Sequence, residues 1–365
     1  MEASRLACPT PTSSEIGCSR GRNRPPHLLE KKAMMPHLSA TRRRLAIGAS
    51  FTAVVLTLAA CGGGGQADTD ADGNTVIKLG MFPVADVAPI YLGIEEGFFD
   101  DEGLSLDVQL ADSGAAVTAS VVAGDSDIGF SNPMSLVLAQ SQDLPIRVVA
   151  PGTTGGATAE EAWSGVIVAA DSPIQGAADL AGKTVAVNSL KNILEVTLRT
   201  ALENEGVDPS SVQLIEMPFP DMPAAIENGQ ADAAFAVEPY ITQAVSAGVA
   251  RVVMTPYESV APEFPTSLYF STSQFIDGHQ QIVEKFQRAL EASVAYAKEH
   301  PEEARDIVTE FTEIDPGVVS AMRMPVFADT IDEEKIELYM QMGVTWGLIE
   351  EAGDVEEFLA GWSAS

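Results

Sequence analysis

The chain has 365 residues, 46% hydrophobic and 20% charged, which is long enough for two domains of ordinary size. Its formal net charge of −31 excludes nucleic acid as a partner and docking on an anionic membrane through protein charge, because both need clustered Lys and Arg. The three Cys all lie in the first 61 residues and the four His are scattered, so we expect no disulfide framework, no metal site and no cofactor.

The first predicted element is an export signal. Arg42–Arg44 form a basic block, and the next 16 residues, Leu45–Ala60, carry no charge. This run is shorter than the roughly 20 residues that span a bilayer, and it fits the core of a signal peptide. It ends in Leu58-Ala59-Ala60-Cys61, which resembles a bacterial lipobox, in which the Cys is lipidated. A cleaved signal with an incidental Cys and a twin-arginine signal are the alternatives.

The segments around this signal differ in composition. Residues 1–33 are rich in Pro and Arg without periodicity and are interpreted as a mis-assigned or disordered leader. Because a signal peptide begins close to its basic block, we expect translation to start at Met34 or Met35 and residues 34–60 to be the signal peptide. We expect residues 61–75 to form a flexible tether. Past Cys61 the chain has 12 basic and 49 acidic residues, a formal net charge of −37.

The body alternates strand and helix from residue 76 on. Its first part predicts helices at 86–96 and 115–123 and strands at 76–82, 104–110, 127–130, 148–150 and 166–169. The pattern then restarts, with helices at 190–204, 222–228 and 241–247 and strands at 183–187, 212–216 and 233–236. After Phe270 it is mostly helical, at 278–299, 301–311, 332–349 and 355–360. This alternation predicts an α/β fold of mixed, mostly parallel sheets flanked by helices.

Two segments repeat one pattern. Gly124–Phe130 and Gly229–Phe235 both read G-x-x-D-x-x-F, and a Pro follows each segment. Gly and Asp are common where a helix ends and a strand begins, so chance is the alternative explanation. We interpret the repeat as a sign of two similar lobes.

Longer blocks resemble a known family, the type II periplasmic binding proteins. The nearest branch is the one that serves ABC importers of nitrate, sulfonates, taurine and thiamine precursors. The matching blocks lie in order along the chain, at Ala88–Phe99, Gly124–Phe130, Leu180–Val187, Gly229–Phe235 with Glu238-Pro239, and Ile282–Tyr296 running into His300-Pro301. The resemblance covers about residues 76–360.

The resemblance implies two α/β lobes joined by two crossovers, with the ligand in the cleft between them and hinge closure around it. We expect the crossovers near 164–166 and 262–268. Lobe 1 is then 76–164 plus 268–365, and lobe 2 is 166–262. The resemblance and the lipobox together imply a monomeric extracytoplasmic protein, anchored to the membrane through Cys61, that hands its ligand to ABC permease subunits.

Ligands of open α/β sheets lie beyond the carboxyl ends of strands. This rule predicts ligand contact for residues that follow four strands: Val84, Ala85 and Asp86; Ser131 and Asn132; Asn188, Ser189, Lys191 and Asn192; and Glu238 and Tyr240. Helix N-termini near Asp86 and Leu190, together with Lys191, favour an anion. Local roles are the alternative: Asp86, Asn188 or Ser189 as helix caps, Ser131 and Asn132 as turn residues, and Lys191 as a solvated side chain.

Asp86 and Glu238 bear on the class of ligand. Two carboxylates would repel a small inorganic anion, so a zwitterion such as an aminosulfonate, or an aminopyrimidine, fits better. We predict a binding protein for a sulfonate- or taurine-like solute. A thiamine-precursor pyrimidine is the alternative ligand, and a tethered ligand sensor is a remoter alternative function. Enzymes that share the fold use a Cys nucleophile or a Cys-rich motif, and no Cys follows Cys61, so we expect no catalysis.

Overall fold

The computed structural model describes residues 69–362. These residues belong to one compact unit. The predicted leader, the signal peptide, Cys61 and the start of the tether all lie outside the described residues. No helix between residues 69 and 362 is both long and apolar enough to cross a membrane.

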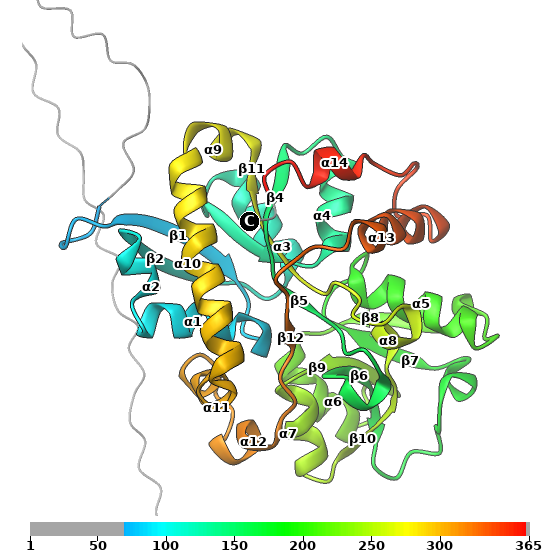
Figure 1. Cartoon of the computed structure of the whole chain (residues 1–365). Helices are drawn as coiled ribbons and strands as arrows, with labels where there is room; N and C mark the ends of the chain where they lie inside the picture. The colour runs from blue at the N-terminus through cyan, green and yellow to red at the C-terminus, as the bar shows by residue number, and fades with distance from the viewer. Residues whose placement is uncertain (1–68, 363–365) are drawn as a thin grey trace, which may run out of the picture. The chain divides into compact units, whose positions relative to one another are not determined.

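The first lobe is built on a five-stranded sheet with the strand order β2-β1-β3-β11-β4 (Figure 1). Strand β1 is parallel to β2 and β3, whereas β11 is antiparallel to β3 and β4. The strands are β1 (Thr75–Met81), β2 (Leu104–Leu110), β3 (Ile128–Ser131), β4 (Ile146–Pro151) and β11 (Leu268–Thr272). Its first helices are α1 (Ala88–Glu95), α2 (Phe98–Asp101), α3 (Gly114–Ala123) and α4 (Pro133–Gln140).

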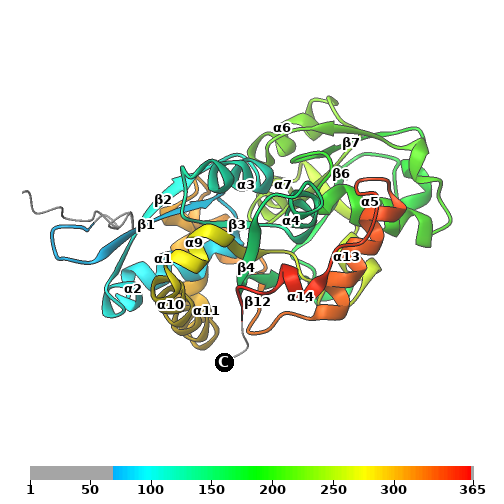
Figure 2. The same ribbon diagram turned by 90° about the horizontal axis from the view of Figure 1, so that it is seen from above.

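The second lobe repeats this plan with the strand order β10-β6-β9-β7-β8. Figure 2 shows its strands β6 and β7 from above. Strand β7 is parallel to β8 and β9, whereas β6 is antiparallel to β9 and β10. The strands are β6 (Ser164–Ala169), β7 (Thr184–Val187), β8 (Gln213–Glu216), β9 (Ala233–Val237) and β10 (Ala250–Met254). The helices are α5 (Ile193–Asn204), α6 (Met222–Glu227), α7 (Tyr240–Ser246) and α8 (Pro256–Val260).

The two-lobed α/β fold with mixed sheets is therefore confirmed. Parallel and antiparallel pairings are equally frequent in each sheet, however, where we expected mostly parallel ones. The reason lies in the connections. Strands β6 and β11 each enter their sheet from the other lobe, and each runs antiparallel to both of its neighbours.

The repeated G-x-x-D-x-x-F segments have the same structural role in each lobe. Gly124 and Gly229 have positive φ values of 80° and 66°, which let the chain leave a helix and turn into β3 or β9. The Asp127 carboxylate accepts the backbone N–H of Lys78 on β1, and the Asp232 carboxylate accepts that of Thr184 on β7, each at 2.9 Å. The sequence repeat thus marks equivalent strand junctions.

Two connections join the sheets, and a third segment lies against them. The chain leaves the first sheet after Pro151 and joins the second at Ser164, where we expected the crossover itself to begin. It returns between Val260 and Leu268. Strand β12 (Val326–Phe327) pairs with β5 (Thr153–Thr154) of the first connection. The division into lobes at the predicted residues remains a prediction.

The C-terminal helices pack mostly on the first lobe. Helix α10 crosses that lobe in Figure 1 and contacts α1 and α2. Helix α13 packs on α4, but Trp346 at its end donates from Nε1 to Thr200 Oγ1 of α5 in the second lobe, at 2.9 Å. The helices are α9 (Ser273–Gly278), α10 (Gln280–Glu299), α11 (Pro301–Asp306), α12 (Pro316–Ala321), α13 (Glu333–Thr345) and α14 (Val355–Phe358).

An aromatic chain fills the core of the first lobe. Phe130, Tyr269, Phe286 and Phe99 are at most 2% exposed, and their successive ring centroids lie 5.3 to 5.9 Å apart. These residues come from β3, β11, α10 and α2, so one cluster ties α10 and α2 to the sheet. Burial of such rings contributes most of the packing energy of a core.

Candidate ligand-binding site

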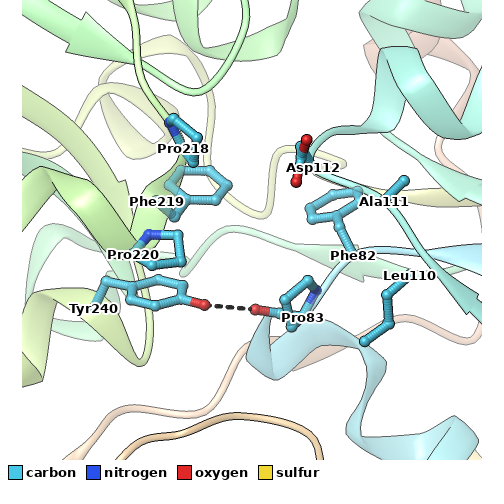
Figure 3. A pocket seen from close by; sticks show the side chains of 9 residues that line it. All are labelled: Phe82, Pro83, Leu110, Ala111, Asp112, Pro218, Phe219, Pro220 and Tyr240. Atoms are coloured by element: carbon cyan, nitrogen blue, oxygen red, sulfur yellow. Dashed lines mark hydrogen bonds between the residues drawn. The ribbon is translucent and has the colours of Figure 1, made fainter. Parts of the chain in front are cut away.

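A pocket lies between the two lobes, at the carboxyl ends of four strands (Figure 3). The first lobe contributes the ends of β1 and β2, and the second lobe contributes the segment after β8 and the start of α7. Its volume is about 180 Å³, below the roughly 300–1,000 Å³ of pockets for drug-sized ligands. The lining residues are Phe82, Pro83, Leu110, Ala111, Asp112, Pro218, Phe219, Pro220 and Tyr240.

The walls of this pocket are aromatic and proline rings. Phe219 and Tyr240 stack on the second-lobe side, with centroids 6.1 Å apart and planes 12° apart, and Phe82 faces them from the first lobe. None of the nine described lining residues is Lys, Arg or His. Asp112 supplies the one full charge, from an exposed position at the edge. The pocket therefore suits a small flat ring with hydrogen-bond donors better than an anion.

Two hydrogen bonds close the bottom of the pocket, and we name them the cross-lobe seam. The Tyr240 hydroxyl donates to the Pro83 carbonyl at 3.0 Å, and the Ala85 N–H donates to the Glu238 carbonyl at 3.4 Å. Each bond joins the segment after β1 to the segment after β9. The lobes are in contact along this line.

Asp86 belongs to a hydrogen-bonded cluster behind the pocket, which we name the hinge cluster: Asp86, Thr153, Thr266 and Ser267. The Thr153 hydroxyl donates to Asp86 Oδ1 at 2.6 Å. A hydroxyl has one proton, so Thr153 accepts from the hydroxyls of Thr266 and Ser267, each at 2.7 Å. Burial raises the pKa of Asp86 to about 6, against the opposing effect of the Thr153 bond. Asp86 thus ties lobe 1 to both connections, and it is not the helix cap that we considered.

The Glu238 carboxylate accepts hydrogen bonds from two residues outside the pocket lining. It accepts from the Thr242 hydroxyl at 2.7 Å, from the Thr242 N–H at 3.1 Å and from the Arg323 N–H at 3.5 Å. Burial raises its pKa. Because these bonds occupy the carboxylate outside the pocket lining, the structure does not support our argument that Glu238 awaits a ligand amine.

Ser131 and Asn132 are buried at the end of β3. Asn132 caps α4, since its Oδ1 accepts the Ser135 N–H at 2.9 Å. The same oxygen lies 3.3 Å from the Ile193 N–H, at the start of α5 in the other lobe. Asn132 therefore bridges the lobes as well as capping a helix.

The segment after β7 differs from its predicted form. Helix α5 begins at Ile193 and Asn192 caps it, whereas we expected a start near Leu190 with Asn188 or Ser189 as the cap. Lys191 has a φ of 55°, which interrupts the helical path, and its side chain is exposed. Asn188 Oδ1 accepts a hydrogen bond from Asn192 Nδ2 at 2.7 Å. The Ser189 hydroxyl lies 3.5 Å from Glu216 Oε1.

Of the predicted ligand residues, all of which lie in the described part of the chain, Tyr240 lines the pocket. Val84 and Ala85 lie directly beside its lining residue Pro83 and are buried. Ligand contact by any of the predicted residues stays a prediction.

Sequence reasoning missed Phe82, Asp112 and Phe219, although the signal was present. We placed Phe82 inside the first predicted strand, whereas β1 ends at Met81. We also applied the strand-end rule to β1, β3, β7 and β9 but not to β2 and β8. Because β2 and β8 are parallel to β1 and β7, their carboxyl ends reach the same edge of each sheet. We selected mostly polar residues at the strand ends and did not consider Phe82 and Phe219.

A larger hollow of about 740 Å³ lies elsewhere, between the end of α4 and the loop 348–354. It is formed by first-lobe elements and lined by several carboxylates, among them Asp143, Glu350 and Asp354. Within residues 69–362 no group of three or more His, Cys, Asp or Glu side chains is arranged to hold a metal ion. Strand ends of both lobes meet at the smaller pocket, which is therefore the better candidate site.

The fold is that of the periplasmic binding proteins. The alkanesulfonate-binding protein of Xanthomonas axonopodis pv. citri, solved with bound MOPS, superposes with a TM-score of 0.65 at 13% identity. The match covers 82% of this chain and 100% of that one. The profile of the NMT1/THI5-like family matches residues 84–304, well over half of the chain, so the chain belongs to that family.

Relatives in this family include binding proteins and an enzyme. A formylaminopyrimidine-binding protein of Halalkalibacterium halodurans is 26% identical, over 71% of this chain and 77% of its own length. The taurine-binding periplasmic protein of Escherichia coli is also 26% identical, over 54% of this chain and 60% of its own length. A 4-amino-5-hydroxymethyl-2-methylpyrimidine phosphate synthase of Aspergillus parasiticus is 22% identical, over 66% and 70%.

Proposed function

We propose that this protein is the extracytoplasmic solute-binding component of an ABC importer. It holds a small solute in the pocket between its lobes and presents it to permease subunits. The observation that carries the proposal is the pocket itself, to which strand ends of both lobes contribute. A ligand in that place touches both lobes at once, so its binding energy favours their closed arrangement.

The ligand class favoured by the lining is an aminopyrimidine. Phe82, Phe219 and Tyr240 offer flat faces to a ring, and the Asp112 carboxylate accepts hydrogen bonds from amino groups. The similarity to a formylaminopyrimidine-binding protein supports this choice. This reverses the order of our sequence-based prediction, because the lining residues include no cation for a sulfonate.

A taurine- or sulfonate-like solute is the second candidate. The similarity to the taurine-binding periplasmic protein of Escherichia coli favours it. An amine-bearing sulfonate would place its amine at Asp112 and would leave the sulfonate to backbone N–H groups. Such a ligand uses the same pocket, so one screen separates the two classes.

Membrane attachment through lipidated Cys61 is part of the proposal. The lipobox-like Leu58–Cys61 and the Gly/Asp-rich stretch after it support a tethered protein. Two or more acyl chains on one Cys would anchor the protein stably, whereas one chain would bind only weakly. We propose no catalytic step, although the related synthase shows that the family includes an enzyme.

A thermal-shift screen of the chain from Gly62 to Ser365 tests the proposal. The panel holds formylaminopyrimidine and other aminopyrimidines, taurine, alkanesulfonates and nitrate. A ligand at a hundred times its Kd adds about 2.7 kcal/mol of stability, which raises the Tm by several degrees. Stabilisation by aminopyrimidines alone is the expected result. Stabilisation by sulfonates alone would overturn the ligand class, and no stabilisation by any compound would contradict solute binding of the family's kind.

A further inference from the structure

We propose that Tyr240 couples occupancy of the pocket to closure of the lobes. Its ring forms one wall of the pocket, and its hydroxyl makes the side-chain bond of the cross-lobe seam. This inference rests on the proposed function for its ligand, but its central test needs no ligand.

Both the ring and the hydroxyl of Tyr240 are held by contacts with other residues. The ring is 4% exposed and stacks on Phe219, which lies in the same lobe. The hydroxyl reaches across to the Pro83 carbonyl, which belongs to the opposite wall of the same pocket (Figure 3). A ligand that settles against the ring therefore holds the hydroxyl in place for its cross-lobe bond. Loss of that bond frees the ring that the ligand packs on.

The other hydrogen bonds described between the lobes do not join two lining residues of the pocket. Asn132 accepts from the Ile193 N–H, and Trp346 donates to Thr200. The Ala85–Glu238 bond of the seam uses backbone atoms of residues outside the lining. Among the cross-lobe hydrogen bonds described within residues 69–362, the Tyr240 bond is the one that joins two lining residues.

The hydroxyl is a constant donor over the range in which a secreted protein works. Burial raises the pKa of Tyr240 to about 12, so the phenol keeps its proton at neutral and mildly alkaline pH. The coupling that we propose therefore depends on the ligand and not on pH.

Tyr240→Phe removes the hydroxyl and keeps the ring. It therefore tests the cross-lobe hydrogen bond without removing the pocket wall that the ring forms. One net hydrogen bond corresponds to about a 2- to 12-fold change in an equilibrium constant. We expect the ligand found in the screen to dissociate faster by a factor in that range, with a smaller change in its association rate. Tyr296→Phe is the matched control, because it removes a hydroxyl bond to Glu303 on the surface of the first lobe.

The distance between the lobes gives a readout without ligand. The chain from Gly62 on contains no Cys, so Ala119→Cys on α3 and Gln213→Cys on β8 place one spin label on each lobe at an exposed position. Double electron–electron resonance on the unliganded protein should show a longer-distance population in Tyr240→Phe that the native pair and Tyr296→Phe lack. Identical distance distributions in all three would overturn the proposal, whether or not a ligand has been found.

An unchanged dissociation rate in Tyr240→Phe would also overturn it. A screen without any stabilising compound, in contrast, contradicts the proposed function and leaves the distance experiment to decide the role of Tyr240. The two failures are therefore distinguishable.

Discussion

The pocket and the hinge cluster both lie where the two lobes meet, yet their chemistry is opposite. The hinge cluster is polar and buried, and the Thr153 hydroxyl at its centre bonds to Asp86 and to the hydroxyls of Thr266 and Ser267. The pocket is lined by rings that face open space. The polar side chains of the hinge cluster use their hydrogen-bonding capacity within the protein and hold the connections in place. The ring faces that line the pocket are available to a ligand.

The comparison teaches that a buried carboxylate in a cleft is not in itself a ligand group. Asp86 and Glu238 are the charged residues that a sequence-based search selects first, and both are occupied by neighbouring donors. Phe82 and Phe219 look like core residues in the sequence, and they line the pocket instead.

The largest expected effect is on stability, at the hinge cluster. Asp86 has a pKa of about 6 in the folded protein against 3.8 as its ordinary value. The folded state therefore binds this proton more tightly, and the contribution of Asp86 to stability is lost as the pH rises through about 6. Asp86→Asn removes the ionisation and should raise the free energy of unfolding by up to about 3 kcal/mol at pH 7 to 8.

Chemical denaturation at a series of pH values measures this difference. The gain in the free energy of unfolding from Asp86→Asn should shrink toward zero near pH 4. At that pH the Asp86 carboxyl of the unsubstituted protein is protonated in the folded state and is neutral, like the Asn side chain. Asp107→Asn, at an exposed position on β2, is the control for a general loss of negative charge. A gain that is the same at every pH would show that Asp86 does not ionise as described.

The next largest effect is on ligand affinity, at the pocket. Phe219→Ala removes a stacking face, which is worth about 1–3 kcal/mol for a flat ring, so Kd should rise about 5- to 150-fold. Phe98→Ala is the matched control, since it truncates a partly buried ring on the first lobe outside the pocket lining. Calorimetric titration at a temperature where both variants are folded measures Kd. Equal affinities in the two variants would remove Phe219 from the site.

A third change probes the hinge cluster through its central hydroxyl. Thr153→Val leaves the Asp86 carboxylate without its hydroxyl donor and should lower the free energy of unfolding by about 1–2 kcal/mol at pH 7. Thr153→Ser keeps the hydroxyl and serves as its control. Urea unfolding of the three proteins measures the effect. A loss as large in Thr153→Ser would point to the methyl group and not to the hydrogen bonds.

The smallest effect is at the edge of the pocket. Asp112 is exposed, so solvent screens its charge. Asp112→Asn should weaken an aminopyrimidine about 2- to 5-fold and should tighten a sulfonate by a similar factor. Competition titrations with both ligands give the two changes side by side. A shift in the same direction for both would contradict a selective role for the charge.

Much of the fold could be predicted because it depends on local patterns. The strand at 104–110 is found with the predicted bounds, and the repeated Gly and Asp residues mark equivalent junctions in both lobes. The antiparallel course of β6 and β11 could not be predicted, because it depends on which lobe the chain comes from. The start of α5 was misplaced because the positive φ of Lys191 leaves no sequence pattern that we recognised.

The predicted ligand residues and the pocket lie at the same edge of the sheets, but the prediction favoured polar residues and the pocket is lined mostly by rings. The strand-end rule led to Tyr240 and to the residues beside Pro83. It did not distinguish polar residues that bond within the protein from rings that face the pocket, since that difference arises only when both lobes are assembled. Asp86 and Phe219 exemplify the two outcomes.

Hydrogen-exchange mass spectrometry with and without the ligand from the screen tests the central claim most directly. If the ligand binds between the lobes, slowed exchange should concentrate at residues 82–87, 110–116, 217–222 and 238–243, which surround the pocket. Slowed exchange confined to residues 137–147 and 348–357 would place the ligand in the larger hollow of the first lobe and would contradict the account.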